Sequence, residues 1–120
     1  PLDSFVMKEL HNWAGELTQK ESSAKYSACP FPWNAAIICW DGSMVPCTQD
    51  FFNHYILGNV NESSIRDIWN NDNMITLRKK LASGNIKDLK ACSECDRPWR
   101  KRIMGIPKEY LWKFITKRMP

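Results

Sequence analysis

Two neighbouring stretches of the chain space their apolar residues every three or four positions, a pattern typical of amphipathic helices. The apolar faces consist of Ile65, Ile68 and Trp69 in the first stretch and of Met74, Leu77 and Leu81 in the second. Ser63 or Ser64 can cap the first helix, Asn71 or Asp72 can cap the second, and Gly84 can end it. We therefore expect two short helices. The basic residues predicted to face solvent on the second are Arg78, Lys79 and Lys80.

Helical spacing is weaker near the two ends of the chain. The N-terminal apolar positions are Val6, Leu10, Trp13 and Leu17. Gly15 and the polar residues 19–23 weaken this prediction. A final helix is expected from Pro107 onward. Its apolar face is Leu111, Phe114 and Ile115, flanked by Lys108, Lys113 and Lys117.

A β-hairpin is expected between residues 35–40 and 43–47, because they flank Asp41-Gly42, a dipeptide that favours a type I′ turn. A two-residue loop would pair Trp40 with Ser43, Cys39 with Met44, and Ala36 with Cys47. Paired residues share a face of the sheet, so Cys39 and Cys47 should project from opposite faces. Free cysteine usually behaves as a small hydrophobic residue, so Cys39 is predicted to be buried filler.

Length and composition narrow the choice of fold and compartment. With 120 residues, 43% of them hydrophobic, the chain can form one domain with a modest core, a size at which a metal often supplements packing. It contains neither an apolar run of about 18 residues nor a secretory pattern, so we expect a soluble, cytoplasmic protein without a membrane partner. The predicted class is α+β: a small irregular domain with a β-hairpin, two to three short helices and metal-organised loops.

Four of the five cysteines indicate a metal site, namely Cys29, Cys47, Cys92 and Cys95. Thiolates select zinc or an iron–sulfur cluster, and ligand chemistry alone does not separate the two. Zinc ribbons usually contain two close cysteine pairs, whereas only Cys92-Ser-Glu-Cys95 forms one here. The dispersed spacing favours a cluster, with zinc as the alternative.

Several short sequence motifs accompany these cysteines in a fixed order. Together with the cysteines they resemble the SPASM domain, the C-terminal auxiliary-cluster domain of radical S-adenosylmethionine enzymes. These motifs are Cys29-Pro-Phe-Pro-Trp33, Gly42-Ser-Met-Val-Pro-Cys47, Asp50, Leu57-Gly-Asn-Val60, Ser64-Ile-Arg-Asp-Ile-Trp69, Arg78 and Cys92-Ser-Glu-Cys95. His11-Asn-Trp-Ala-Gly15 also resembles the segment by which some of these enzymes leave their partial barrel.

The resemblance implies one 4Fe-4S cluster held by Cys29, Cys47, Cys92 and Cys95, serving electron transfer, substrate binding or both. Full SPASM domains have further cysteines and a second cluster, but no cysteine lies beyond Cys95. The alternative is a zinc-stabilised structural or interaction module without a redox role. Charge compensation for a cluster would come from backbone N–H groups around Trp33, Gly42 and Cys47 and from Arg97 or Arg100.

We do not expect this chain to be catalytic alone, because the Cys-x3-Cys-x2-Cys motif that holds the S-adenosylmethionine cluster is absent. S-adenosylmethionine would bind only in a parent barrel. His11 and His54 are separated in sequence and accompany no catalytic motif, so both are predicted to be surface or packing residues. The parent would be a radical S-adenosylmethionine oxidoreductase or modifying enzyme, whose substrate is a peptide or a small molecule.

The expected organisation has three parts: a lead-in at 1–28 from a radical S-adenosylmethionine barrel, an iron–sulfur domain at 29–99 and a basic amphipathic helix at 100–120. Between Arg97 and Arg118 there are eight Lys or Arg residues and one Glu. We expect this segment to dock on the barrel, because no groove-reading motif accompanies its charge to indicate nucleic acid.

Several single residues carry two interpretations. Gly58 either supplies a positive φ near the cluster or is an ordinary turn glycine. The six tryptophans could form a platform for substrate, but Trp33, Trp40 and Trp69 are predicted to fill the core instead. Asp50 either orients a group near the cysteine at position 47 or caps a turn.

Overall fold

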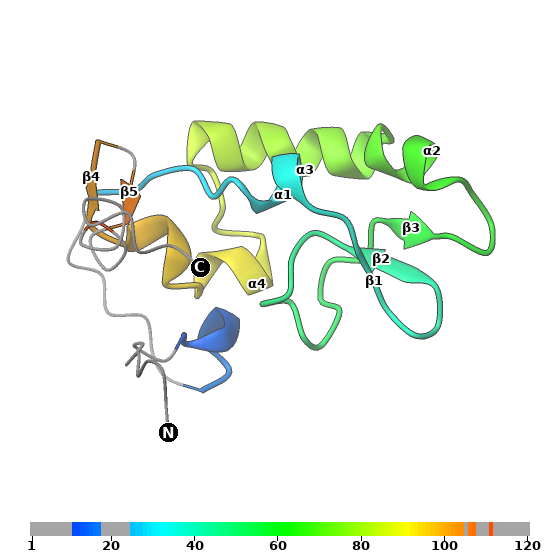
Figure 1. The fold of residues 1–120 in the computed structure, drawn as a ribbon, viewed down its shortest axis with the longest axis horizontal. Helices are drawn as coiled ribbons and strands as arrows, with labels where there is room; N and C mark the ends of the chain where they lie inside the picture. Colours follow the sequence, from blue (N-terminus) through cyan, green and yellow to red (C-terminus); the bar gives the residue numbers. More distant parts are fainter. Residues whose placement is uncertain (1–10, 18–24, 105, 108–110, 112–120) are drawn as a thin grey trace, which may run out of the picture.

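The described part of the chain comprises residues 11–17, 25–104, 106–107 and 111 of a computed structural model. In chain order, its elements are η1 (Trp13–Gly15), α1 (Phe31–Asn34), β1 (Ile37–Ile38), β2 (Ser43–Val45), β3 (Gly58–Asn59), α2 (Ile65–Trp69), α3 (Asp72–Ser83), α4 (Lys90–Ser93), η2 (Arg97–Trp99), β4 (Arg102–Ile103) and β5 (Ile106–Pro107). The antiparallel sheet β1-β2-β3 and α2 lie towards one end of α3, and β4–β5 lies towards the other (Figure 1). The predicted α+β class is confirmed.

Both predicted internal helices form with the expected caps. The Ser64 hydroxyl accepts a hydrogen bond from the Asp67 N–H at 3.2 Å and begins α2. The Asn71 side chain accepts one from the Met74 N–H at 2.9 Å and begins α3. Gly84 ends α3 at φ 77°, a left-handed conformation that glycine adopts without a Cβ penalty.

One apolar core joins the sheet to the helices. Its buried members are Met44, Leu57, Ile68, Met74, Leu77, Leu81, Ile86 and Leu89. The predicted helical faces supply Ile68, Met74, Leu77 and Leu81, which are at most 2% exposed. Cys92 packs against the edge of this core, so the core fixes one side of the predicted metal site. Within the described residues, no helix has the length and apolarity needed to cross a bilayer.

The β1–β2 hairpin exists, but its predicted register was wrong by one residue. Ile38 pairs with Met44, and the Cys39 N–H donates to the Ser43 carbonyl at 2.8 Å. The loop therefore contains three residues, of which only Gly42 has a positive φ, at 86°. The Asp41 carboxylate explains this turn, because it accepts hydrogen bonds from the Ser43 N–H and hydroxyl, both at 3.0 Å. The opposite-face argument for Cys39 and Cys47 therefore fails.

The tryptophans also differ from the prediction. Trp40 is 99% exposed at the hairpin tip because the longer loop carries it beyond the paired residues. Trp33 is 42% exposed, since the short helix α1 buries Pro32 instead. Trp69 is half-buried and packs against the core. Core filling thus holds only for Trp69.

Gly58 serves close packing. It lies in β3 without a positive φ, and a Cβ at this position would lie 3.0 and 3.1 Å from two side-chain carbons of Ile68. The strand β3 can therefore pack this closely against α2 only because residue 58 has no side chain. Neither of the two predicted roles, a positive φ or an ordinary turn, describes this position.

The described residues near the two ends are not the helices predicted there. Trp13, Ala14 and Gly15 all have positive φ, at 50°, 57° and 93°, so η1 is a left-handed turn. Residues 102–107 include the strands β4 and β5, although a basic helix was expected from position 100. Met104 at φ 51° and Pro107, which biases Ile106 towards an extended conformation, explain the hairpin. Except for Leu111, the helix expected after Pro107 lies outside the described residues, as do Val6 and Leu10.

Candidate metal centre

The four predicted ligands come from three separate segments of the chain. Cys29 lies two residues before α1, separated from it by Pro30, and Cys47 follows β2 after Pro46. Cys92 lies in α4, and Cys95 follows that helix by two residues. Cys95 is buried and the other three are half-buried, and all four are free thiols. The sheet, α1 and α4 therefore each supply part of the predicted site.

Electrostatics shows which cysteines are neighbours. Burial strongly raises the pKa of the Cys92 thiol, and the charges of Cys47, Cys95 and Cys29 raise it further. Burial, followed by Asp96, Cys47 and Cys29, raises the pKa of Cys95 to about 12. Burial also raises the pKa of Cys47, with a smaller contribution from Cys29. Each of the four cysteines thus lies within electrostatic range of at least two others.

Backbone N–H groups oppose these shifts at two of the sulfurs. The N–H groups of Gln49 and Asp50 hydrogen-bond to the Cys47 side chain and lower its pKa. The N–H group of Arg97 does the same for Cys95. Such donors stabilise a negative sulfur, as metal-bound thiolate requires. The prediction of N–H donors around Cys47 is met, whereas Arg97 contributes its backbone N–H at Cys95 while its guanidinium carbon lies 4.6 Å from the centre of the Phe31 ring.

The sulfur atoms of the four cysteines fit a bound metal ion or metal cluster, because its positive charge would offset the negative charge of the thiolates. Burial raises the pKa values of the Cys47, Cys92 and Cys95 thiols, so these three stay protonated at neutral pH, and as thiolates they would repel one another. Cations bound between the sulfurs remove this penalty. In the described residues, no group of three or more Cys, His, Asp or Glu is already arranged to hold a single metal ion. The fit therefore rests on the chemistry and proximity of the sulfurs.

Comparison with models of protein families shows to which family the chain belongs. Residues 29–96 match the model of the SPASM family, described as an iron–sulfur cluster-binding domain. The chain belongs to the SPASM family. The match begins at the first predicted ligand and ends one residue after the last.

Two relatives place this SPASM domain within longer proteins. It is 33% identical over 88 residues to an S-adenosyl-L-methionine-dependent 2-deoxy-scyllo-inosamine dehydrogenase of Niallia circulans, covering 72% of this chain and 35% of the relative. It resembles the crystal structure of BtrN in complex with AdoMet and 2-DOIA, with a TM-score of 0.63 and 29% identity. That similarity covers 83% of this chain and 37% of the solved one. The chain therefore spans just over a third of the length of these relatives.

Cys39 has different interactions from the other cysteines of the SPASM domain. Its thiol donates to the Asn53 side-chain oxygen at 3.4 Å. It is not among the groups that shift the pKa of Cys47, Cys92 or Cys95. Its half-buried position and this hydrogen bond agree with a structural residue. That Cys39 is not a ligand stays a prediction.

Asp50 caps the loop that follows Cys47. It is 2% exposed, and its two carboxylate oxygens accept hydrogen bonds from the His54 N–H at 2.8 Å and the Tyr55 N–H at 2.9 Å. These bonds bring the loop back towards β3 and fix the N–H groups that face the Cys47 sulfur. The turn-capping alternative for Asp50 is therefore confirmed. Neighbouring Gln49, 4% exposed, was not singled out from the sequence.

The two histidines lie in separate polar contacts, each with an acidic residue. His54 Nε2 is 3.1 Å from Glu16 Oε1. His11 Nδ1 contacts the Arg100 guanidinium and lies 3.8 Å from Asp96 Oδ2. Burial lowers the pKa of His11, and Arg100 and Arg97 lower it further. These contacts agree with the prediction that both are packing or surface residues.

Arg78 does not face solvent, contrary to the prediction. Its Nε donates to the Pro32 carbonyl and its terminal nitrogen to the Trp69 carbonyl, both at 3.0 Å. The guanidinium carbon also lies 4.5 Å from the centre of the Trp69 ring. Short helices leave carbonyls without intrahelical partners, and Arg78 satisfies one in α1 and one in α2. It thereby fixes α1, and with it the segment after Cys29, against α3.

Sequence reasoning noted Asn12 only as part of the segment His11-Asn-Trp-Ala-Gly15 and gave it no role at the predicted site. Asn12 is 3% exposed and contacts the backbone on both sides of Cys95, across more than 80 positions. A single asparagine in an irregular segment has no spacing that marks it. Only the folded chain brings it to the metal centre.

Proposed function

We propose that this chain is the auxiliary-cluster domain of a radical S-adenosylmethionine enzyme and that Cys29, Cys47, Cys92 and Cys95 hold one 4Fe-4S cluster. The observation that supports this proposal is that Cys47, Cys95 and Cys29 all contribute to the raised pKa of the buried Cys92 thiol, whereas Cys39 is not among its causes. The family match over residues 29–96 supports the iron–sulfur assignment. When bound through all four thiols, such a cluster would supply one-electron transfer, whereas substrate binding at iron would require one of the four thiols not to ligate.

The residues of this chain have three tasks in that role. The four thiols lose their protons and bind the cluster irons. The N–H groups of Gln49, Asp50 and Arg97 stabilise negative charge on two of the sulfurs. The core residues beside Cys92 restrict water on one side of the site. Together they would set the potential at which the domain accepts or donates an electron.

The parent enzyme is proposed from the relatives. Both are longer than this chain, which leaves room for a barrel that binds S-adenosylmethionine and substrate. By similarity to the dehydrogenase, we propose an oxidoreductase. Its substrate remains a peptide or a small molecule, because similarity in the auxiliary domain does not describe the barrel cavity. We also propose the cytoplasm as its compartment, because thiolate ligation would require cysteines that stay reduced.

The test is anaerobic reconstitution with iron and sulfide of the wild type and of five Cys→Ala variants. Iron, acid-labile sulfide and zinc are measured per chain, together with the visible spectrum before and after dithionite. We expect about four iron and four sulfide in the wild type. Substitution at position 29, 47, 92 or 95 should reduce both contents.

Cys39→Ala is the matched control, because it removes a half-buried thiol whose interactions differ from those of the others. It should retain the wild-type content of iron and sulfide. Loss of the cluster in Cys39→Ala would refute the ligand assignment. Tight binding of zinc without stable sulfide would refute the redox role and favour the structural zinc module.

A further inference from the structure

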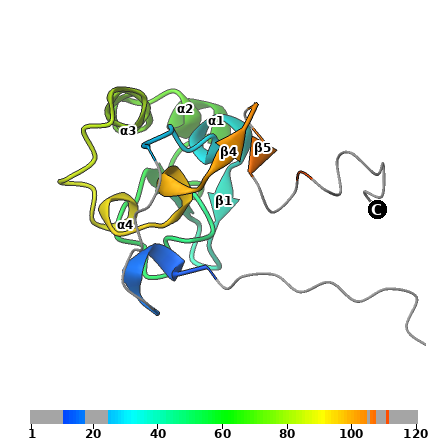
Figure 2. The same ribbon diagram turned by 90° about the vertical axis from the view of Figure 1, so that its left-hand side faces the viewer.

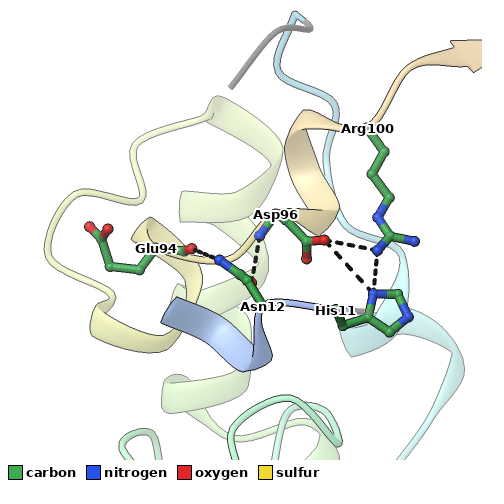
Figure 3. A network of polar contacts seen from close by, with 5 residues as sticks. All are labelled: His11, Asn12, Glu94, Asp96 and Arg100. Carbon is green, nitrogen blue, oxygen red and sulfur yellow. Dashed lines mark hydrogen bonds and ion pairs between the residues drawn. The ribbon is translucent and has the colours of Figure 1, made fainter. Parts of the chain in front are cut away.

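The side-chain amide of Asn12 forms hydrogen bonds with the backbone on both sides of Cys95. Its Nδ2 donates to the Glu94 carbonyl at 2.6 Å, and its Oδ1 accepts from the Asp96 N–H at 3.1 Å. Figure 3 shows this amide lying between the two backbone groups that flank the cysteine. Asn12 is 3% exposed, so water cannot readily replace either bond. One side chain from a distant segment thus holds the backbone on both sides of a proposed ligand.

The residues after Asn12 pack directly on the same cysteine. Ala14, Ala91 and Cys95 form a small buried cluster separate from the main core. Gly15 approaches so closely that a Cβ there would lie 2.7 Å from the Glu94 Cβ. The blue η1 segment and α4 lie side by side in Figures 1 and 2. Residues 11–15 therefore cover the Cys92–Cys95 segment on one side.

The shape of this segment is imposed by its contacts. Trp13 and Ala14 adopt left-handed φ values that residues with a Cβ disfavour. The Asn12 carbonyl closes the turn by accepting from the Gly15 N–H at 3.0 Å and the Leu17 N–H at 3.2 Å. On the opposite side of Asn12, His11 lies against Asp96 and Arg100 (Figure 3). Residues 11–15 are thus fixed to residues 94–100 at several points.

We propose that residues 11–15 form a clamp on the Cys92–Cys95 segment and that Asn12 is a positioning residue for Cys95. This inference rests on the proposed function, in which Cys95 binds the cluster. The clamp lies outside the family match at residues 29–96, so the site extends beyond the matched domain. Groups that orient a ligand without touching the metal commonly change metal affinity about 10- to 100-fold when removed.

The test compares Asn12→Ala with Asn71→Ala in protein reconstituted anaerobically. Asn71 is a matched control, because its amide also bridges two backbone groups, accepting from the Met74 N–H at 2.9 Å and donating to the Leu57 carbonyl at 2.8 Å. Three quantities are measured: iron and sulfide per chain, the rate of iron release to a ferrous chelator, and the electron paramagnetic resonance spectrum of the reduced cluster. Thermal unfolding is followed in parallel.

We expect Asn12→Ala to release iron roughly tenfold faster than the wild type and to change the resonance spectrum. Asn71→Ala should lower the unfolding temperature but keep the wild-type spectrum and release rate at temperatures where it is folded. If Asn12→Ala fails to fold, Gly15→Ala decides, because it leaves the Asn12 amide in place and displaces Glu94. Gly15→Ala should then show the faster release.

Two outcomes separate this inference from the proposed function. A wild-type protein with a full cluster, alongside Asn12→Ala or Gly15→Ala with wild-type release and spectrum, would overturn only the positioning role. A wild-type protein that assembles no cluster would refute the proposed function, and the inference with it.

Discussion

The guanidinium of Arg78 makes contacts outside the candidate metal centre whose loss we expect to be costly. It donates two hydrogen bonds of 3.0 Å to backbone carbonyls and lies 4.5 Å from the Trp69 ring centre. A hydrogen bond to a charged group contributes about 1.5–3 kcal/mol, and a cation–π contact about 0.5–1 kcal/mol at exposed sites. Because Arg78 is half-buried, the lower ends of these ranges apply.

From these contacts we expect Arg78→Ala to lower the free energy of unfolding by about 3.5 kcal/mol. Arg78→Lys keeps the charge but loses the planar fork, so it can satisfy only one of the two carbonyls. Its loss should be about 1.5 kcal/mol. The intermediate value of the lysine variant would show that the geometry of the donor matters in addition to its charge.

The assay is urea unfolding of anaerobically reconstituted protein, followed by far-ultraviolet circular dichroism. The control is Lys79→Ala, an exposed neighbour on the same helix that should change the free energy by less than about 0.5 kcal/mol. The reasoning is refuted if Arg78→Ala is no less stable than Lys79→Ala. It is also refuted if Arg78→Lys loses as much as Arg78→Ala, since charge would then contribute nothing.

Three further substitutions test the fold by the same unfolding assay. Gly58→Ala should lower the free energy of unfolding by about 1–3 kcal/mol, because its Cβ would lie 3.0 Å from a side-chain carbon of Ile68. The double variant with Ile68→Ala should lose less free energy than the sum of the two single variants, and an additive loss would contradict the close packing. Ser64→Ala should cost about 1 kcal/mol through the lost helix cap, and an unchanged midpoint would contradict the cap. Trp40→Ser should change stability by less than about 0.5 kcal/mol because Trp40 is 99% exposed, and a larger loss would place it in the core.

Sequence reasoning succeeded where the controlling interactions are local. Ser64 and Asn71 cap helices through hydrogen bonds to residues three positions away, and Gly84 ends α3 by its own conformation. Such signals lie within one or two helical turns and can be read directly from the chain. The apolar stripe of α3 was predictable for the same reason, because spacing alone places its residues on one face.

Sequence reasoning failed where a side chain determines which of two backbone conformations forms, or where its partners are distant in the sequence. Asp41 favours a three-residue loop by bonding to Ser43, and this single choice changes the register and exposes Trp40. Arg78 donates hydrogen bonds to the carbonyls of Pro32 and Trp69, which lie near it only after α1 and α2 have packed beside α3. Asn12 meets its partners across more than 80 positions. None of these partners can be inferred from spacing.

The position of the four cysteines links cluster binding to the fold. Cys92 packs against the main core, whereas Cys95 packs with Ala14 in a separate buried cluster. A group bound to both sulfurs, and also to Cys29 and Cys47, would therefore connect the core, the sheet loop and the lead-in segment. Without it, the buried thiols stay protonated and supply no such connection. Binding of the cluster should thus contribute to the free energy of folding as well as to electron transfer, because the site is assembled only in the folded chain.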